Sequence, residues 1–558
     1  MVDVKRGFVT VGDRQVHYRY AGEGPPVILI HQSPTSSKTL DLQTRTFAAR
    51  FRAIAIDIPG MGLSDAIPNC APTMADLAIG LAATLDALGI ERAALYGSHT
   101  GASICVEFAR LFPERAVKVL IDGYPIYTEG EMARRVSTYL QDYTESWDGS
   151  HLLWLWYRYR EQYLYWPWNA PGRGTRANCD VPDADFLHSG VVDLLGAGNG
   201  YQRPYLAAFR YAAEAAIGEV TVPVVFLAYA DDSLTVAHDL LPTLPPNCTI
   251  EAMPFDRTEG AQKELELFLE SGNYADAPQI PLTSPLAAGP TRSYVDAGEH
   301  QLATREMGRG GPRPLVMLPP APGSGTRFLP LLKELSKTRR VIAIDLPNCG
   351  DSDDFGSDAL SIEAIAAIVG RALERLGLVE CDLYGLNGGA LAALELATTH
   401  PGIVGTLILD GLPYLEPRVR PDLADHYSPA IDVNWDGTHW LTMWHAVRNE
   451  QLFWPWYDQT AQATRNIEPH LDPTALTEMV HSYMKHPARY ADTYRAVFAY
   501  DAEKKLSELK TVPFLCAQEY DVFFEPARRA ASDLGAAFAT LTTSINENVQ
   551  TLNSFLPG

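Results

Sequence analysis

The sequence contains little cysteine and no surplus of basic residues. Only seven of its 558 residues are cysteine, an odd number with no CxxC pair, so neither a disulfide framework nor a zinc ribbon is favoured. Lys and Arg total 45 against 68 Asp and Glu, which gives a formal charge of −23. Since no basic field attracts phosphate groups, we expect no nucleic-acid partner and no binding to membranes.

Long apolar runs, phosphate-binding loops and metal-ligand spacings are also missing. No run approaches the roughly 20 apolar residues that a membrane helix needs, and residues 1–8 lack the apolar region of a signal peptide. Together with the cysteine usage, these features predict a cytoplasmic protein. No cofactor and no metal is expected, and the partner is a small-molecule substrate. The oligomeric state stays open.

One part of the chain occurs twice, 288 residues apart. The segment AIAIDIPGMGLSD at 53–65 recurs, with changes, as VIAIDLPNCGDSD at 341–353. The same shift carries Trp-Pro-Trp at 166–168 to Trp-Pro-Trp at 454–456. An offset that stays constant over such a length indicates a tandem duplication.

The length and the duplication together predict the domain organisation, because 558 residues exceed one ordinary core several times over. The stretch 273–292 has four prolines among small residues, which predicts a linker. We expect a first domain at 1–272, a linker at 273–292 and a second domain at 293–558, with caps inserted at about 123–220 and 411–510.

Each copy alternates short apolar runs with helical patterns. The runs are too short for helices and do not alternate with polar residues, as expected of strands that are covered on both faces. A helical pattern such as 74–88 separates them. The predicted class is therefore α/β, with a mostly parallel sheet flanked by helices. In the first copy the expected strands are 27–30, 53–56, 93–96, 119–121 and 224–227.

Three motifs, in this order, resemble those of the α/β-hydrolase family. They are IHQSP at 30–34, similar to the oxyanion-hole loop, DIPGMGLSD at 57–65, similar to the strand-to-loop signature, and GSHTG at 97–101, which has the position and glycine spacing of the nucleophile elbow. The resemblance implies two tandem α/β-hydrolase domains, each with a helical, aromatic-rich cap.

The resemblance also implies that the catalytic triads of both copies are degenerate. The elbow position, which holds Ser, Cys or Asp in the family, is His99 in the first copy and Asn387 in the second. No histidine follows the last predicted strand, at 253–259 or at 541–546. Without such a base a serine stays a poor nucleophile, so a Ser-His-Asp hydrolase is disfavoured.

His99 is the main catalytic candidate, either as a general base or as a donor to a developing oxyanion, because imidazole titrates near neutrality. The alternative is that His99 has no catalytic role and remained after catalysis was lost. Its acid partner is Asp231 or Asp232: family spacing points to Asp232, whereas aligning Pro223 with Pro513 places Asp231 opposite Asp521. The sequence does not decide between them.

The oxyanion loop and the elbow supply the other pocket candidates, which are His31, Gln32, Ser33, Ser98 and Thr100. We favour a structural role for His31 under the loop, and backbone N–H groups of Gln32 and Ser33 as the better oxyanion donors. A nucleophile at Ser98 or Ser33 is a further alternative.

The segment 147–168 is rich in aromatic residues and is expected to wall an apolar or planar ligand. Three of its tyrosines differ from their counterparts in the second copy, and Arg158 or Arg160 suits a ligand carboxylate. His151 corresponds to His439 of the second copy, so a role in supporting the fold suits it better than base catalysis. The substrate-binding candidates are Tyr157, Tyr159, Tyr163, Arg158 and His151.

These observations favour an enzyme of the α/β-hydrolase superfamily. We expect it to act on a small, partly aromatic carbonyl compound by general acid/base chemistry of a hydrolase or lyase type, in the first domain and without a serine nucleophile. The alternative is a catalytically inert ligand-binding or scaffold protein with the same fold, since fold alone does not establish function.

Overall fold

The computed structural model describes residues 2–232, 234, 244–272, 274–354, 356 and 360–557. They divide into two compact units, and each unit contains one eight-stranded sheet. The first unit comprises Met1–Thr144 and His151–Leu286, and the second comprises Glu145–Ser150 and Ala287–Gly558.

The sheet of the first unit has the order β1-β2-β4-β3-β5-β6-β7-β8. The β1–β2 and β2–β4 pairs are antiparallel and all other pairs are parallel. Every residue of β3 to β6 is buried, which explains their near-continuous apolar sequences. The strands are β1 Lys5–Val11, β2 Arg14–Ala21, β3 Pro26–Ile30, β4 Arg52–Ile56, β5 Ala93–Ser98, β6 Ala116–Asp122, β7 Val224–Ala228 and β8 Cys248–Ala252.

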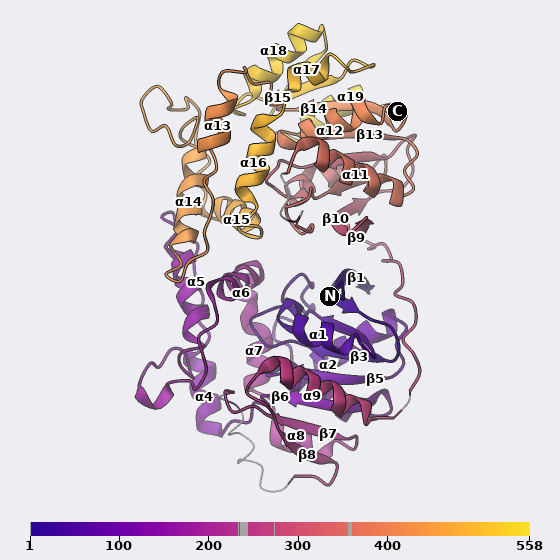
Figure 1. Ribbon diagram of the computed structural model, residues 1–558, viewed down its shortest axis with the longest axis vertical. Helices are drawn as coiled ribbons and strands as arrows, with labels where there is room; N and C mark the ends of the chain where they lie inside the picture. Colours follow the sequence, from indigo (N-terminus) through magenta and orange to yellow (C-terminus); the bar gives the residue numbers. More distant parts are fainter. Residues whose placement is uncertain are drawn as a thin grey trace. The chain divides into compact units, whose positions relative to one another are not determined.

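Helices cover this sheet, so the predicted α/β class is confirmed (Figure 1). Helix α2 packs on α3, and α1 packs on α9. The chain between β6 and β7 forms five further helices, which make the cap. The helices are α1 Asp41–Phe47, α2 Met74–Ala87, α3 Thr100–Leu111, α4 Glu129–Thr138, α5 Ser150–Glu161, α6 Ala184–Ala197, α7 Gln202–Phe209, α8 Ala213–Glu219 and α9 Arg257–Leu269.

The second unit repeats this architecture, and its sheet order β9-β10-β12-β11-β13-β14-β15-β16 is the same topology. Its strands are β9 Thr291–Ala297, β10 His300–Met307, β11 Leu315–Leu318, β12 Val341–Ile344, β13 Cys381–Leu386, β14 Val404–Asp410, β15 Phe514–Gln518 and β16 Phe538–Leu541. Its helices are α10 Leu329–Leu335, α11 Ile362–Arg375, α12 Gly388–Thr399, α13 Arg420–His426, α14 Thr438–Glu450, α15 Pro473–Met484, α16 Tyr490–Ala499, α17 Ala502–Leu506, α18 Phe524–Leu534 and α19 Ile545–Phe555.

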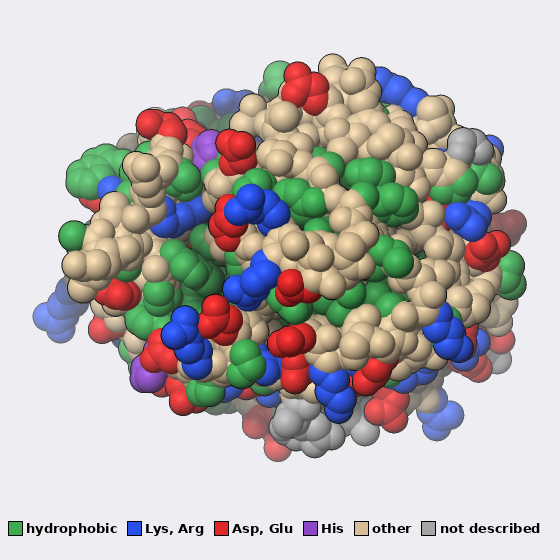
Figure 2. Space-filling model, turned by 90° about the horizontal axis from the view of Figure 1, so that it is seen from above, with side chains coloured by type: hydrophobic (Ala, Val, Ile, Leu, Met, Phe, Trp, Pro, Cys, Tyr) green, Lys and Arg blue, Asp and Glu red, His purple; other side chains and the backbone are tan. Residues whose placement is uncertain are grey.

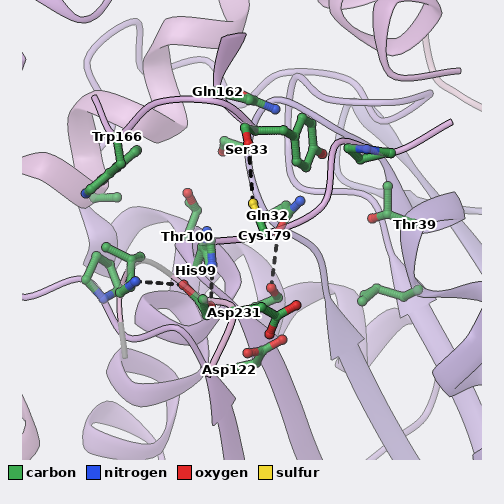
Figure 3. A pocket seen from close by; sticks show the side chains of 18 of the residues that line it. Gln32, Ser33, Thr39, His99, Thr100, Asp122, Gln162, Trp166, Cys179 and Asp231 are labelled. Atoms are coloured by element: carbon green, nitrogen blue, oxygen red, sulfur yellow. Dashed lines mark hydrogen bonds and ion pairs between the residues drawn. The ribbon is translucent and has the colours of Figure 1, made fainter. Parts of the chain in front are cut away.

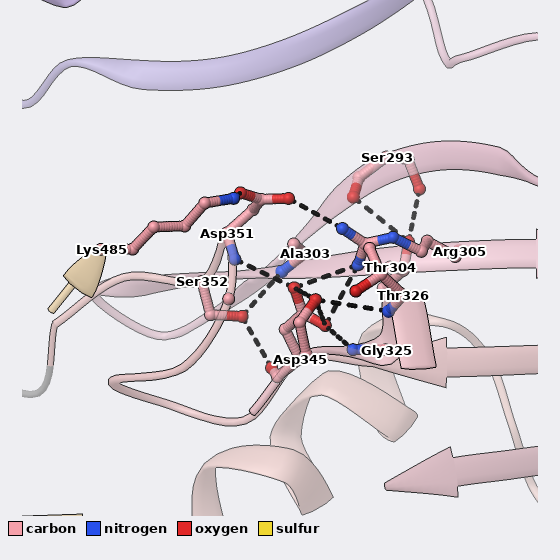
Figure 4. Close-up of polar contacts among 12 residues, drawn as sticks. Ser293, Ala303, Thr304, Arg305, Gly325, Thr326, Asp345, Asp351, Ser352 and Lys485 are labelled. Atoms are coloured by element: carbon pink, nitrogen blue, oxygen red, sulfur yellow. Dashed lines mark hydrogen bonds and ion pairs between the residues drawn. The ribbon is translucent and has the colours of Figure 1, made fainter. Parts of the chain in front are cut away.

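A buried aspartate after the fourth strand of each sheet ties loops together. Asp57 accepts the Ser37 and Leu63 backbone N–H groups at 2.7 and 2.9 Å and pairs with His17 at 2.8 Å. In the second unit Asp345 takes this place and is paired with Arg305 at 3.0 Å (Figure 4). Buried carboxylates need such partners, so the Asp of the strand-to-loop motif serves the fold.

On the face drawn in Figure 2, acidic and basic side chains lie intermixed among hydrophobic ones. In the ranges that the structure describes, none of the helices has both the length and the hydropathy to cross a bilayer.

Close packing of α3 against β3 gives a first prediction. A Cβ on Gly101 would lie 2.1 Å from the Ile30 carbonyl oxygen, whereas a Cβ on exposed Gly130 would meet nothing within 4 Å. Gly101→Ala should therefore destabilise the protein by about 1–3 kcal/mol, and Gly130→Ala should leave it unchanged or stabilise it by about 0.4–1 kcal/mol. Calorimetric unfolding of the full chain measures both, and equal effects of the two changes would contradict this packing argument.

Candidate active site

A sharp turn between β5 and α3 carries His99. Its backbone lies at φ 48°, ψ −106°, a conformation that costs free energy for a residue other than glycine. The flanking glycines make the turn possible: a Cβ on Gly97 would lie 2.4 Å from the Gly101 carbonyl oxygen. In the second unit Asn387 has the same backbone conformation, φ 49° and ψ −114°. Both units thus raise the side chain at this position out of the sheet edge.

The His99 ring is hydrogen-bonded to Asp232, which follows β7. Nε2 lies 2.9 Å from Asp232 Oδ2, and 35 % of the histidine side chain but only 5 % of the aspartate side chain is accessible. The Leu234 N–H donates to Asp232 Oδ1 at 2.7 Å and fixes the carboxylate. Gly123, at φ 68°, leaves room for the pair, because a Cβ there would lie 2.3 Å from the His99 ring.

Asp231 contacts a different group. Its Oδ1 accepts a hydrogen bond from Arg257 at 3.0 Å. The structure therefore separates the two neighbouring acids: Asp232 contacts His99 and Asp231 contacts Arg257.

His99 and Asp232 each stabilise the charged form of the other. Burial lowers the pKa of His99, but the charge and hydrogen bond of Asp232 raise it by more, so the pKa lies above its usual 6.5. Burial raises the pKa of Asp232, and His99 lowers it to below its usual range. Because a carboxylate only accepts hydrogen bonds, Nε2 carries the proton that lies between them. Among the described residues, Nδ1 has no hydrogen-bond partner.

A second buried acid lies beneath this pair. Asp122, at the end of β6, accepts from Tyr96 at 3.3 Å and contacts Arg257 at 3.5 Å. Burial and the charge of Asp232 raise the pKa of Asp122 to about 6. Arg257 itself lies over the Tyr229 ring at 3.8 Å.

Arg257 is a site residue that the sequence reasoning missed. Arg257 begins α9, in the segment where the family has its relay histidine, and it is the one basic residue among residues 253–259. That isolated basic side chain is the feature of the sequence that points to it.

The sheet ends and the cap enclose a cavity of about 530 Å³ (Figure 3). Eight of the residues predicted from the sequence line it, namely His99, Asp231, Asp232, Gln32, Ser33, Ser98, Thr100 and Tyr163. The other lining residues are Thr39, Leu40, Leu42, Gln43, Tyr96, Asp122, Pro125, Tyr127, Tyr139, Gln162, Trp166, Cys179, Asp180, Pro182, Phe186, Tyr205, Ala208, Phe209, Leu234 and Arg257.

His31 lies under the oxyanion loop instead of in the cavity lining. It is fully buried; the Ile58 N–H donates to Nε2 at 2.9 Å, and Nδ1 donates to the Gln32 carbonyl at 2.8 Å. An imidazole that accepts at one nitrogen and donates at the other is neutral, and burial lowers its pKa further. His31 therefore holds the loop shape.

The other four cap candidates are also absent from the described lining. Tyr157 points outward and is 45 % exposed, whereas Tyr159 is buried with its hydroxyl 3.2 Å from that of Tyr163. Arg158 and His151 are 1 % and 3 % exposed inside the cap. These four side chains are not part of the cavity wall, because α5 turns Tyr157 outward and the other three into the cap interior.

Two backbone amides near His99 are available to an oxyanion. Among the described residues, the N–H groups of Gln32 and Thr100 donate to no protein acceptor. The Thr100 amide lies at the start of α3, where helix N–H groups are unpaired. The second unit has Pro320 at the position of Gln32 and so lacks that donor.

The described residues contain no group of three or more His, Cys, Asp or Glu side chains arranged to hold a metal ion.

The family model of the alpha/beta hydrolase fold matches residues 25–166 and 313–523, more than half of the chain. The chain belongs to the alpha/beta hydrolase fold family. Matching in both units agrees with the duplicated sheet topology.

Curated relatives of this alpha/beta hydrolase fold protein include a 2-hydroxy-6-oxononadienedioate/2-hydroxy-6-oxononatrienedioate hydrolase of Paraburkholderia phymatum, 39% identical over 115 residues. A 2-hydroxy-6-oxo-6-phenylhexa-2,4-dienoate hydrolase of Comamonas testosteroni is 32% identical over 117 residues. Each alignment covers 20% of this chain, and the chain spans 40% and 41% of these relatives. A solved enol-lactonase from Burkholderia xenovorans LB400 is 20% identical with a TM-score of 0.37, over 47% of this chain and 96% of that one.

Titration of His99 tests the electrostatics of the site. Asp232→Asn should lower the pKa of His99, because the charge and hydrogen bond of that carboxylate cause its rise. Asp231→Asn removes the same charge one residue away, from the Arg257 contact, and should shift this pKa less. NMR titration of the imidazole measures both; equal shifts would refute the pairing.

Proposed function

We propose that the first unit is an enzyme that acts on a small, partly aromatic carbonyl compound by general acid/base chemistry, without a covalent serine intermediate. The observation that carries this proposal is the His99–Asp232 hydrogen bond at the N-terminal end of α3, on the wall of a cavity of about 530 Å³. Imidazole poised by a carboxylate is a common proton-transfer group.

In this proposal His99 Nδ1 is the general base. Asp232 holds the proton on Nε2, so the unpartnered Nδ1 bears the lone pair in the neutral ring. Nδ1 takes a proton from an attacking water in a hydrolytic reaction, or from the substrate in a lyase-type reaction. The Gln32 and Thr100 amides would then donate to the developing oxyanion.

The aromatic lining and the relatives support the substrate class. Tyr127, Tyr139 and Trp166 offer flat apolar walls, which suit a planar ligand. The two relatives named above are hydrolases of oxo-dienoates, one of them with a phenyl group.

An inert ligand-binding protein is the second candidate, and one observation favours it. In the second unit Asn387 Nδ2 donates to Asp521 Oδ2 at 2.9 Å, so the same link exists there with a side chain that does not titrate near neutrality. The link therefore also has a structural use.

The change His99→Asn separates these two candidates. It installs the side chain that already makes this bond in the second unit, so the fold should persist while the base is lost. We expect the turnover of aryl ketones and esters, surveyed as a panel, to fall about 10²–10⁴-fold. Unfolding temperature is the control, and unchanged turnover would remove His99 from the mechanism.

A mechanism with a serine nucleophile predicts that a fluorophosphonate labels the protein. Ser98 Oγ lies 3.3 Å from Gln32 Oε1, and neither Ser98 nor Ser33 is hydrogen-bonded to a histidine among the described residues. We expect an active-site-directed fluorophosphonate to leave the protein unlabelled.

The pH dependence of turnover distinguishes a base from a proton donor at His99. A base works in its neutral form, so kcat/KM should rise with pH through the elevated pKa of His99, above 6.5. In Asp232→Asn the rise should move to lower pH. A rate that instead falls across this range would show that the protonated ring acts as a donor.

A further inference from the structure

The cap of the first unit contains a buried arginine without a counterion. Arg158 on α5 is 1 % exposed, and among the described residues no carboxylate forms an ion pair with it. Its guanidinium carbon lies 4.6 Å from the Trp168 ring, 5.2 Å from Tyr139 and 5.8 Å from Tyr201. Its Nε and Nη2 atoms are buried without hydrogen-bond partners. A buried charge in such a state usually has a function, because burial disfavours it.

Arg158 fixes the orientation of a cavity residue. Its Nη1 lies 3.3 Å from Gln162 Oε1. A guanidinium only donates, so the Gln162 amide must turn its oxygen to Arg158 and its NH2 group away from it. Because Gln162 lines the cavity (Figure 3), that NH2 group is the part of the amide left to donate to a ligand.

The second unit has a carboxyl group among the corresponding tyrosines, and burial raises the pKa of this group, Glu450, to about 7. Ala446 replaces Arg158 and Glu450 replaces Gln162, whereas Tyr139 is retained as Tyr427. Glu450 Oε1 accepts from the Tyr427 and Tyr494 hydroxyls, each at 3.3 Å. The arginine and glutamine positions thus both differ between the units, around tyrosines that the units share.

Charges in the first unit are unevenly distributed around the cavity. Asp122, Asp231 and Asp232 lie at the sheet ends, where Arg257 pairs with the first two, and Arg158 lies in the cap on α5. A second buried guanidinium without an ion pair among the described residues, Arg135, stacks on Tyr127 at 4.7 Å and on Trp166 at 4.4 Å, two rings of the cavity wall. The remaining lining acid, Asp180, is exposed, where solvent screens its charge.

We propose that Gln162, held by the positioning residue Arg158, binds a carboxylate at the cap end of the substrate, opposite the carbon on which His99 acts. This rests on the proposed function for the location of the reaction. A carboxylate suits the site better than a neutral oxygen, because the amide donor is backed by an uncompensated positive charge. With His99 neutral, the three acids at the sheet ends outnumber Arg257, so such a group is disfavoured there and the substrate is oriented.

The test compares two ligands of the same ring and length, 3-phenylpropionate and 3-phenylpropionamide, by calorimetric binding to the full chain. The wild type should bind the carboxylate about 10-fold tighter than the amide. Arg158→Ala should bring the ratio close to one, and Gln162→Glu should reverse it. Both variants install residues of the second unit, where the same tyrosines accommodate them.

Arg160→Ala is the matched control, since Arg160 lies on the same helix and pairs with Glu161 at 2.8 Å; it should keep the wild-type ratio. His99→Asn should keep the ratio as well, so a loss of turnover there and a loss of carboxylate preference in Arg158→Ala are separate results. Absence of carboxylate binding, equal binding of the two ligands by the wild type, or a preference that survives Arg158→Ala would overturn the proposal.

Discussion

One hydrogen bond, from the imidazole of His99 to the carboxylate of Asp232, joins the two strand ends on which the site is built. The bond depends on backbone features around it. His99 occupies a strained turn after β5, and Gly123 leaves the space after β6 that the two side chains fill. Without either feature the partners would not meet, and the raised pKa of His99 would have no cause.

The duplication makes the chain its own comparison. Strand register pairs Ile121 with Phe226 in one sheet and Leu409 with Leu515 in the other, so Asp232 corresponds to Asp521. The link from the turn to this acid exists in both units. What differs is the surrounding chemistry: the second unit has Asn387, Tyr520, Ile545 and Pro320 where the first has His99, Asp231, Arg257 and Gln32. The framework is therefore shared, whereas the imidazole, the Asp231–Arg257 pair and the amide donor of Gln32 belong to the first unit alone.

The fold was largely predictable because strands buried on both faces leave unmistakable apolar runs, and the family motifs occur in order. The antiparallel β1 lacks such a run because most of its residues are partly exposed, and β2 lacks one because polar residues such as Gln15 and His17 occupy buried positions. Asp231 and Asp232 could not be separated, because adjacent residues at a strand end point in different directions and only the register decides. Tyr157 and Tyr159 are not part of the cavity wall, because the helical turn of α5 points one outward and buries the other.

The pairing of His99 sets the charge pattern of this end of the cavity. Asp232 must stay ionised to hold His99, and Asp122 lies close enough for its pKa to rise to about 6. Each added negative charge at the sheet ends would cost more free energy in this buried setting. In the orientation proposed above, an anionic group of the substrate lies at the cap, where two buried guanidiniums contact aromatic rings. The carboxylate that poises the imidazole would then also favour one direction of binding for a charged substrate.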